Sequence, residues 1–450
     1  MALAAVCCQH DGSGQMPGQV VLASAACQVR WRWQVTPAEL RAAGRLSGQF
    51  FSRGVSRVEL VHQAISGRAF GPLRQAGAPA RRVHDVVAGG VYAAIRGAGL
   101  ATGVVGGAVV SRFGAGGQSV SAAPGGNLAL SAVNAIAGDR LGTDLAPLAI
   151  SMAVRVAGHD IELSPRQLAS DFPAATPRLA VFVHGLAETE DSWQRRHEVS
   201  VPYGQRLQAD YGYTPAYLRY NTGRHVSANG HDLADLLSAL TAAWPTEVTE
   251  VLLVGHSMGG LVIRSACHYG EQRSAAWTQL VRHVFYLGAP HLGAPAARAA
   301  GFSGLALGLL AETRPFVSLV NGSSAGIKDL RYGYLLDDDW ADCDQDSCLR
   351  DHRRRTPLLA GANHHVISAT VTADPSHRVG ALVGDLLVQP ASAHGRHGDR
   401  QVIGFAAKSG REVGGAHHFD LLNHAPVWAA MRGLLESEQS ETQQAETRQA

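Results

Sequence analysis

The stretch VLLVGHSMGGLVIRSA, residues 251–266, decides the fold of this 450-residue chain. An apolar run of strand length leads into the turn GHSMG (255–259), and a helix-forming segment follows. A strand, a G-x-S-x-G turn and a helix in this order form a nucleophile elbow, which exposes the serine oxygen to a base. The alternative is that GHSMG is a glycine-rich turn with a structural role only. Because strand, turn and helix all lie in order, Ser257 is the predicted nucleophile.

A second apolar run, LAVFVHGLAETEDSW (179–193), ends in a His-Gly pair about seventy residues before the elbow. Acyl transfer needs two N–H donors aimed at the tetrahedral oxyanion, one directly after the nucleophile and one in the loop after this earlier strand. We therefore expect the backbone N–H groups of Met258 and Leu186 to form the oxyanion hole. His184 is expected to be structural.

The base and the acid must follow the nucleophile in the chain order serine, acid, histidine. Near the end of the chain, GGAHHFDLLNHAPVW (414–428) offers His417, His418 and His424 as bases. Between elbow and base, the acid candidates are Asp374 in TADPSH and Asp385 in VGDLLVQPASAHG. Asp374 directly follows a predicted strand but precedes a proline, a pairing that commonly initiates a turn. The residues themselves leave these alternatives open.

The chain can be divided into regions by its sequence patterns. We predict a helical accessory region over 36–172. It contains capping boxes at TPAE (36–39) and SPRQ (164–167), and its small residues recur with helical periodicity. From residue 173 to 438, short apolar runs alternate with helix-length segments, which predicts an α/β domain with a mainly parallel sheet. Residues 1–35 are expected to be a poorly ordered lead-in, and the polar residues 439–450 a disordered tail. Strands are predicted at 179–183, 215–219, 248–254, 283–287, 366–371 and 402–406.

Composition limits the partners. Lysine and arginine total 39 against 37 acidic residues, with no long run of one sign, so a nucleic-acid partner is not expected. The six cysteines lack C-x-x-C spacing, and the sequence predicts no metal site and no cofactor. Cys343 and Cys348 could form a bridge in an oxidising compartment, against the alternative of two free thiols. The oligomeric state is left open.

The N-terminal segment MALAAVCCQHDG has no basic region, and the longest uncharged apolar stretch, 97–111, is too short to span a bilayer. A cytoplasmic location is therefore expected, with peripheral membrane contact as an option if the substrate is a lipid.

Six motifs together resemble a known family: VHGL, LRYNTGRHVSANG, GHSMGG, YLGAPHLGAP, VGDLLV and HHFDLLNH. Over about residues 177–436 the chain resembles bacterial lipases and the GPI inositol deacylase-like branch of the α/β-hydrolases. The resemblance implies an α/β-hydrolase fold, in which the histidine before the FDLL run, His418, is the base. It also implies that Asp385 is the acid, although Leu386 stands where the family often has glycine.

By resemblance, the chain is a serine hydrolase that cleaves carboxylic esters of lipid-like substrates through an acyl-enzyme. The alternatives are an acyltransferase or thioesterase with the same three residues, and a lipid-binding scaffold without activity. The apolar segment GFSGLALGLLAE (301–312) has two interpretations, a lid over an acyl chain and a buried helix.

Overall fold

The computed structural model describes residues 36–70, 126–195, 200–294, 324–342, 351–398 and 400–449, with scattered positions between 85 and 108. The predicted lead-in (1–35), the predicted lid (301–312) and the pair Cys343 and Cys348 therefore lie outside the described residues. Among the helices that are described, none combines the length and the apolarity that crossing a bilayer requires.

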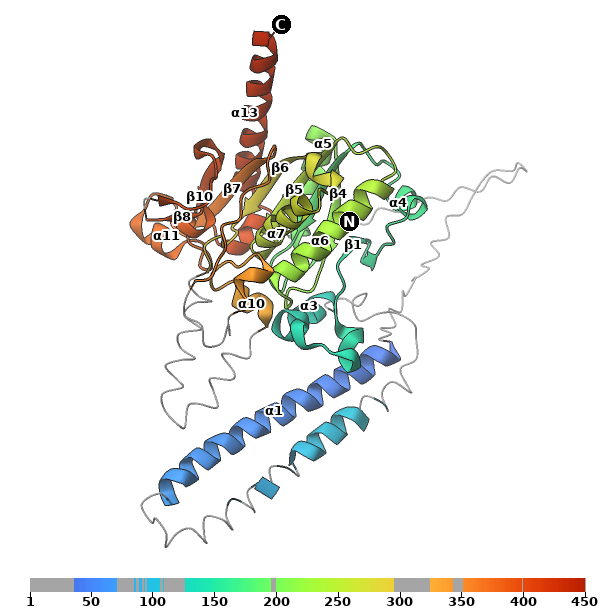
Figure 1. Ribbon diagram of the computed structural model, residues 1–450, viewed down its shortest axis with the longest axis vertical. Helices are drawn as coiled ribbons and strands as arrows, with labels where there is room; N and C mark the ends of the chain where they lie inside the picture. The colour runs from blue at the N-terminus through green and yellow to red at the C-terminus, as the bar shows by residue number, and fades with distance from the viewer. Residues whose placement is uncertain are drawn as a thin grey trace, which may run out of the picture. The chain divides into compact units, whose positions relative to one another are not determined.

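An eight-stranded sheet organises the chain, in the order β10-β7-β6-β5-β3-β4-β1-β2 (Figure 1). The strands β3 to β7 and β10 run parallel, while β1 pairs antiparallel with β4 and with β2. The strands are β1 (Ala153–Val156), β2 (His159–Asp160), β3 (Arg178–Val183), β4 (Tyr213–Arg219), β5 (Glu250–His256), β6 (Val281–Leu287), β7 (Asn363–Thr370) and β10 (Gly410–Gly414). The predicted fold class, a mainly parallel sheet with flanking helices behind a helical N-terminal region, is confirmed.

Helices cover both faces of this sheet, and for that reason the central strands β3 and β5 carry unbroken apolar runs, LAVFV (179–183) and VLLV (251–254). Side chains of β5 alternate between two cores. Leu253 packs in one with α6 (Val226–Ala243) and α7 (Met258–Gln272), whereas Leu252 and Val254 pack in the other with α5 (Tyr203–Tyr211) and α13 (Ala425–Gln449). The continuous run VLLV therefore fills both cores at once.

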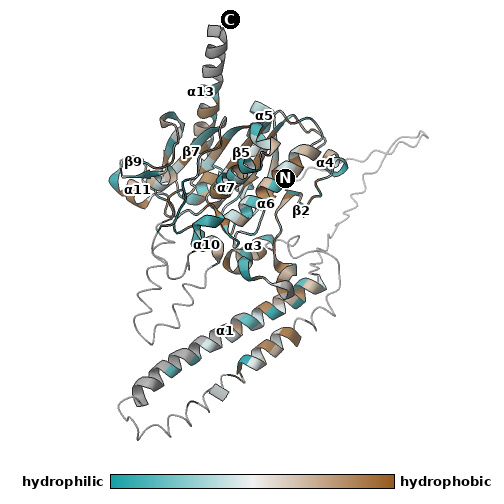
Figure 2. Cartoon of the chain, viewed as in Figure 1, coloured by the Kyte–Doolittle hydropathy of each residue, from teal (hydrophilic) through white to brown (hydrophobic). Residues whose placement is uncertain are grey.

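The N-terminal part is mainly helical where it is described, apart from β1 and β2. The predicted capping box at Thr36 opens α1 (Pro37–Phe70), since the Thr36 hydroxyl accepts from the Glu39 N–H and the Glu39 carboxylate accepts from the Thr36 N–H. In the coloured part of α1, hydrophilic and hydrophobic residues are interspersed (Figure 2). Its Ala42 and Leu46 share a small core with Leu130 of α3 (Gly126–Ala137).

The structure differs from the sequence predictions at three places. The strand predicted at 402–406 is wrong, because the strand beside β7 is β10, Gly410–Gly414. This edge strand exposes polar residues and buries mainly Val413, so its apolar pattern is weak. The region predicted to be helical contributes β1 and β2 to the sheet. Helix α13 extends to Gln449, through the segment predicted to be a disordered tail, and alanine, glutamate and glutamine there have high helix propensity.

Candidate active site

Ser257 connects β5 to α7 in a strained conformation. Its φ is 51° and its ψ is −122°, which a residue with a side chain rarely adopts. Such strain costs on the order of 1–3 kcal/mol and persists only where the surroundings impose it. The Ser257 N–H donates to the carbonyl of Leu287 at the end of β6, which anchors the turn at the carboxyl ends of the strands.

The glycines around Ser257 are required by close packing. A Cβ on Gly259 would lie 2.2 Å from the carbonyl oxygen of Val183, and one on Gly255 would lie 2.6 Å from the nitrogen of Gly260. Both contacts are shorter than van der Waals distances allow. The elbow therefore fits between β3 and α7 only because these positions lack side chains.

The loop after β3 lies directly against the serine. A Cβ added to Gly185 would lie 3.0 Å from the Cβ of Ser257, and Leu186 lines the same cavity as Ser257. Met258 is the first residue of α7, where an N–H has no intrahelical acceptor. For the Leu186 N–H, the contacts among the described residues include no acceptor within the chain. Both predicted oxyanion donors are thus placed beside the serine.

His418 and Asp385 are in direct contact. His418 Nδ1 lies 2.7 Å from Asp385 Oδ2, and both side chains are almost fully buried. The other carboxylate oxygen of Asp385 accepts from the N–H groups of Leu387 and Val388, so the acid is held from two sides. The His418 N–H in turn donates to the Asp385 carbonyl oxygen, which fixes the two loops together.

The loop that carries Asp385 folds back onto β7. After the strand, the chain makes an excursion through α11 (Arg378–Val383) and returns, and the Val371 N–H donates to the Gly384 carbonyl oxygen. Gly384 has a φ of 66°, and a Cβ there would lie 2.0 Å from the Val388 carbonyl oxygen. This loop therefore brings Asp385 close to the end of β7 in space, although the two are well separated in sequence.

The competing candidates lie elsewhere. Asp374 is exposed, and its carboxylate accepts from the backbone and hydroxyl of Ser376, as expected for a turn. His417 pairs with Asp420 and is half exposed. His424 uses its backbone N–H to bind the Tyr203 hydroxyl, and its buried Nδ1 has no partner among the described residues.

A buried ion pair that sequence reasoning missed lies behind the site. His256 Nδ1 is 2.9 Å from Glu188 Oε1, and Glu188 also accepts from the Gly185 N–H. Burial opposes ionisation of both groups, yet each holds the other charged: the pKa of His256 is raised and that of Glu188 is lowered. The sequence offers one clue to this pair, namely that a glutamate, Glu188, stands three residues after Gly185.

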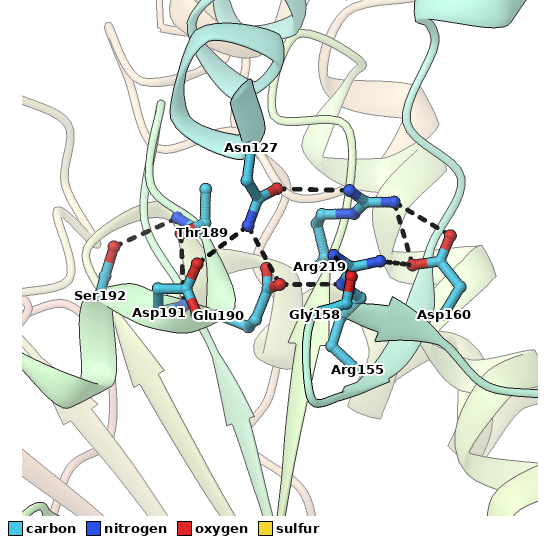
Figure 3. Close-up of polar contacts among 9 residues, drawn as sticks. All are labelled: Asn127, Arg155, Gly158, Asp160, Thr189, Glu190, Asp191, Ser192 and Arg219. Carbon is cyan, nitrogen blue, oxygen red and sulfur yellow. Dashed lines mark hydrogen bonds and ion pairs between the residues drawn. The ribbon is translucent and has the colours of Figure 1, made fainter. Parts of the chain in front are cut away.

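Polar residues from the N-terminal part hold the loop after β3 in place (Figure 3). Arg155 of β1 pairs with Glu190 at 2.8 Å, and Asn127 of α3 donates to Glu190 and Asp191. The Ser131 hydroxyl donates to the Glu188 carbonyl oxygen. Residues before 173 therefore fix the segment that carries Leu186 and Glu188.

Ser257 and His418 both open onto a cavity of about 260 Å³. Apart from them and Glu188 its walls are apolar, formed by Leu186, Pro290, Ala294, Ile327, Leu330, Leu387, Val388 and Phe419. A larger cavity, of about 520 Å³, contains neither residue and is lined by arginines, among them Arg264 and Arg353. The smaller cavity is the one that Ser257 and His418 line together.

Comparison with known proteins agrees with the fold. Residues 176–345 match the PGAP1-like alpha/beta domain family. A triacylglycerol lipase of Burkholderia plantarii is 30% identical over 152 residues, a match that covers 32% of this chain and 38% of the length of that lipase.

Two solved structures are distantly similar. The mature lipase BlEst2 of Bacillus licheniformis shares 18% identity and a TM-score of 0.38, covering 57% of this chain and 91% of that one. Lipase B of Aspergillus fumigatus shares 10% identity and has a TM-score of 0.35. This match covers 65% of this chain and 57% of that one. The family match and the lipase relative therefore show what part of this chain is similar to, a PGAP1-like alpha/beta domain and a triacylglycerol lipase.

Proposed function

We propose that this protein is a serine hydrolase that cleaves carboxylic esters of lipid-like substrates, with Ser257 as nucleophile, His418 as base and Asp385 as supporting acid. The observation that carries the proposal is the contact between His418 Nδ1 and Asp385 Oδ2, because His418 also lines a cavity together with Ser257. A carboxylate at Nδ1 holds the imidazole in the tautomer whose Nε2 can accept a proton.

The mechanism is two-step acyl transfer. His418 Nε2 removes the proton of the Ser257 hydroxyl as its oxygen attacks the ester carbonyl, and the oxyanion is stabilised by the N–H groups of Leu186 and Met258. The same proton is then given to the leaving alcohol as the ester bond breaks. Water, deprotonated by His418, attacks the acyl-enzyme and releases the acid and the free serine.

The apolar cavity supports the substrate class. Removing apolar surface from water contributes about 25 cal/mol per Å², so an acyl chain placed against these side chains gains binding energy, whereas a charged chain does not. The name of the Burkholderia plantarii relative, triacylglycerol lipase, agrees with this inference.

The test is a series of p-nitrophenyl esters of increasing acyl length, with Ser257→Ala as the blank. We expect turnover by the wild type, a preference for acyl groups longer than acetate, and no turnover by the variant. Absence of turnover with every ester would contradict the proposal.

An acyltransferase or a thioesterase would use the same residues. The first would be recognised by transfer to an added alcohol in competition with water, and the second by a higher kcat/KM on the matched thioester. A lipid-binding scaffold would bind the lipid without turnover.

A further inference from the structure

A second cluster of chemically active side chains lies away from Ser257. His283 Nδ1 is 3.4 Å from His365 Nε2 and 3.0 Å from Glu438 Oε2, and His365 Nε2 is 3.4 Å from Glu438 Oε1. Among the described residues these are the three whose ligand atoms gather within 4.8 Å as a metal site would require.

The sheet fixes the two histidines. In the parallel pair β6 and β7, Phe285 is opposite His365 and His283 is opposite Asn363, so the two imidazoles lie on one face, two residues apart along the strands. His365 is almost fully buried and its ring stacks on Phe285. Glu438 comes from α13, and the Asn363 amide donates to its Oε2 at 2.7 Å. Two ligands therefore stand on rigid strands, and the third is oriented by a neighbour.

The distances fit a small tetrahedral ion. Zinc binds imidazole nitrogen and carboxylate oxygen at about 2.0–2.2 Å, so neighbouring ligand atoms of a tetrahedral site are about 3.3–3.6 Å apart. The two imidazole nitrogens are 3.4 Å apart. The Glu438 carboxylate lies close to both of them, with Oε2 3.0 Å from His283 Nδ1 and Oε1 3.4 Å from His365 Nε2. Two imidazoles and one carboxylate are also the ligand types that suit zinc and related transition metals rather than calcium or magnesium.

We propose that His283, His365 and Glu438 bind a divalent transition metal of the zinc class, with water as the fourth ligand. The metal would tie the polar part of α13 to the sheet, beyond Leu435, the last residue of that helix in the apolar core.

The site is separate from the ester chemistry. His283 is opposite Leu252 of β5, five residues before Ser257, which places it about 16 Å along the strand from the serine. The role of the metal is therefore structural, and loading should leave the reaction at Ser257 unchanged.

The experiment uses the full chain, dialysed against EDTA and then titrated with Zn²⁺ alone. Calorimetry and metal analysis after dialysis are expected to show one equivalent bound, with a rise of several degrees in Tm. Glu438→Gln and His283→Gln should each weaken binding by at least about tenfold and remove the Tm rise. Glu436→Gln, an exposed glutamate on the same helix, is the matched control and should bind as the wild type does.

Circular dichroism and fluorophosphonate labelling at Ser257 establish that each variant is folded. If one ligand variant fails to fold, the other decides. Binding that is absent in the wild type, or equal in the wild type and a folded ligand variant, would overturn the proposal and leave an ion-paired histidine cluster without metal.

Discussion

His256 supports His418 from behind: its Nε2 lies 3.1 Å from the His418 carbonyl oxygen, while its Nδ1 lies against the carboxylate of Glu188. The residue before the nucleophile thus joins the loop after β3 to the loop that carries the candidate base. This contact is backbone-directed, so it positions His418 and leaves its ring free for Asp385.

The ion pair gives a pH-dependent stability. The pKa of Glu188 is lowered in the folded state, so its contribution is lost as pH falls through that folded pKa. The pKa of His256 is raised, so its contribution is complete below about pH 6.5 and is lost as pH rises through its folded pKa. We expect Glu188→Gln to lower the free energy of unfolding by about 3 kcal/mol near pH 6, because it leaves a buried charge unpaired. Urea unfolding at pH 6 and pH 9 checks this: the deficit should shrink at pH 9, and an equal deficit at both would refute the coupling.

Asp385→Asn should reduce turnover by up to about 10⁴, since the amide cannot hold the same imidazole tautomer. Asp374→Asn is the control and should remain near wild type, because its carboxylate contacts only the Ser376 turn among the described residues. Steady-state kcat with both variants, checked for folding, decides between them. If Asp374→Asn is the variant that loses turnover, our assignment of Asp385 as the acid is wrong.

Gly259→Ala should destabilise the fold by more than about 3 kcal/mol or prevent folding, because the added Cβ would overlap backbone oxygens of Val183 and His184. Gly433→Ala in α13 meets no atom within 4 Å and should stabilise by about 0.5–1 kcal/mol through helix propensity. Thermal unfolding of both variants tests the close packing. Equal effects would mean that the elbow tolerates a side chain.

Leu386 occupies the position where related loops often carry glycine, and its φ is 84°. Its side chain is 61% exposed, so little packing is lost on its removal. We predict that Leu386→Gly leaves turnover intact and raises stability by up to about 1 kcal/mol, since a left-handed residue with a side chain costs about 1–2 kcal/mol. A stability loss measured by urea unfolding would show that the side chain itself holds the loop.

The elements that the sequence predicts correctly are those whose local pattern and tertiary environment agree. The run VLLV is buried on both faces, so its apolarity alone marked β5, and the elbow followed from its glycines. β10 was missed because an exposed edge strand needs few apolar residues. The link between Glu188 and His256 spans 68 positions, and the histidine–glutamate cluster on β6, β7 and α13 spans 155. Such contacts form only in the folded sheet, so no local sequence pattern predicts them. The sequence prediction of no metal site rested on cysteine spacing alone.

The role of Ser257 as nucleophile is tested most directly by covalent labelling with a fluorophosphonate, followed by mass spectrometry of the tryptic peptides. One modification per chain is expected, on Ser257, absent in Ser257→Ala and strongly slowed in a folded His418 variant. A wild-type protein that is folded yet unlabelled, or labelled on another residue, would contradict it.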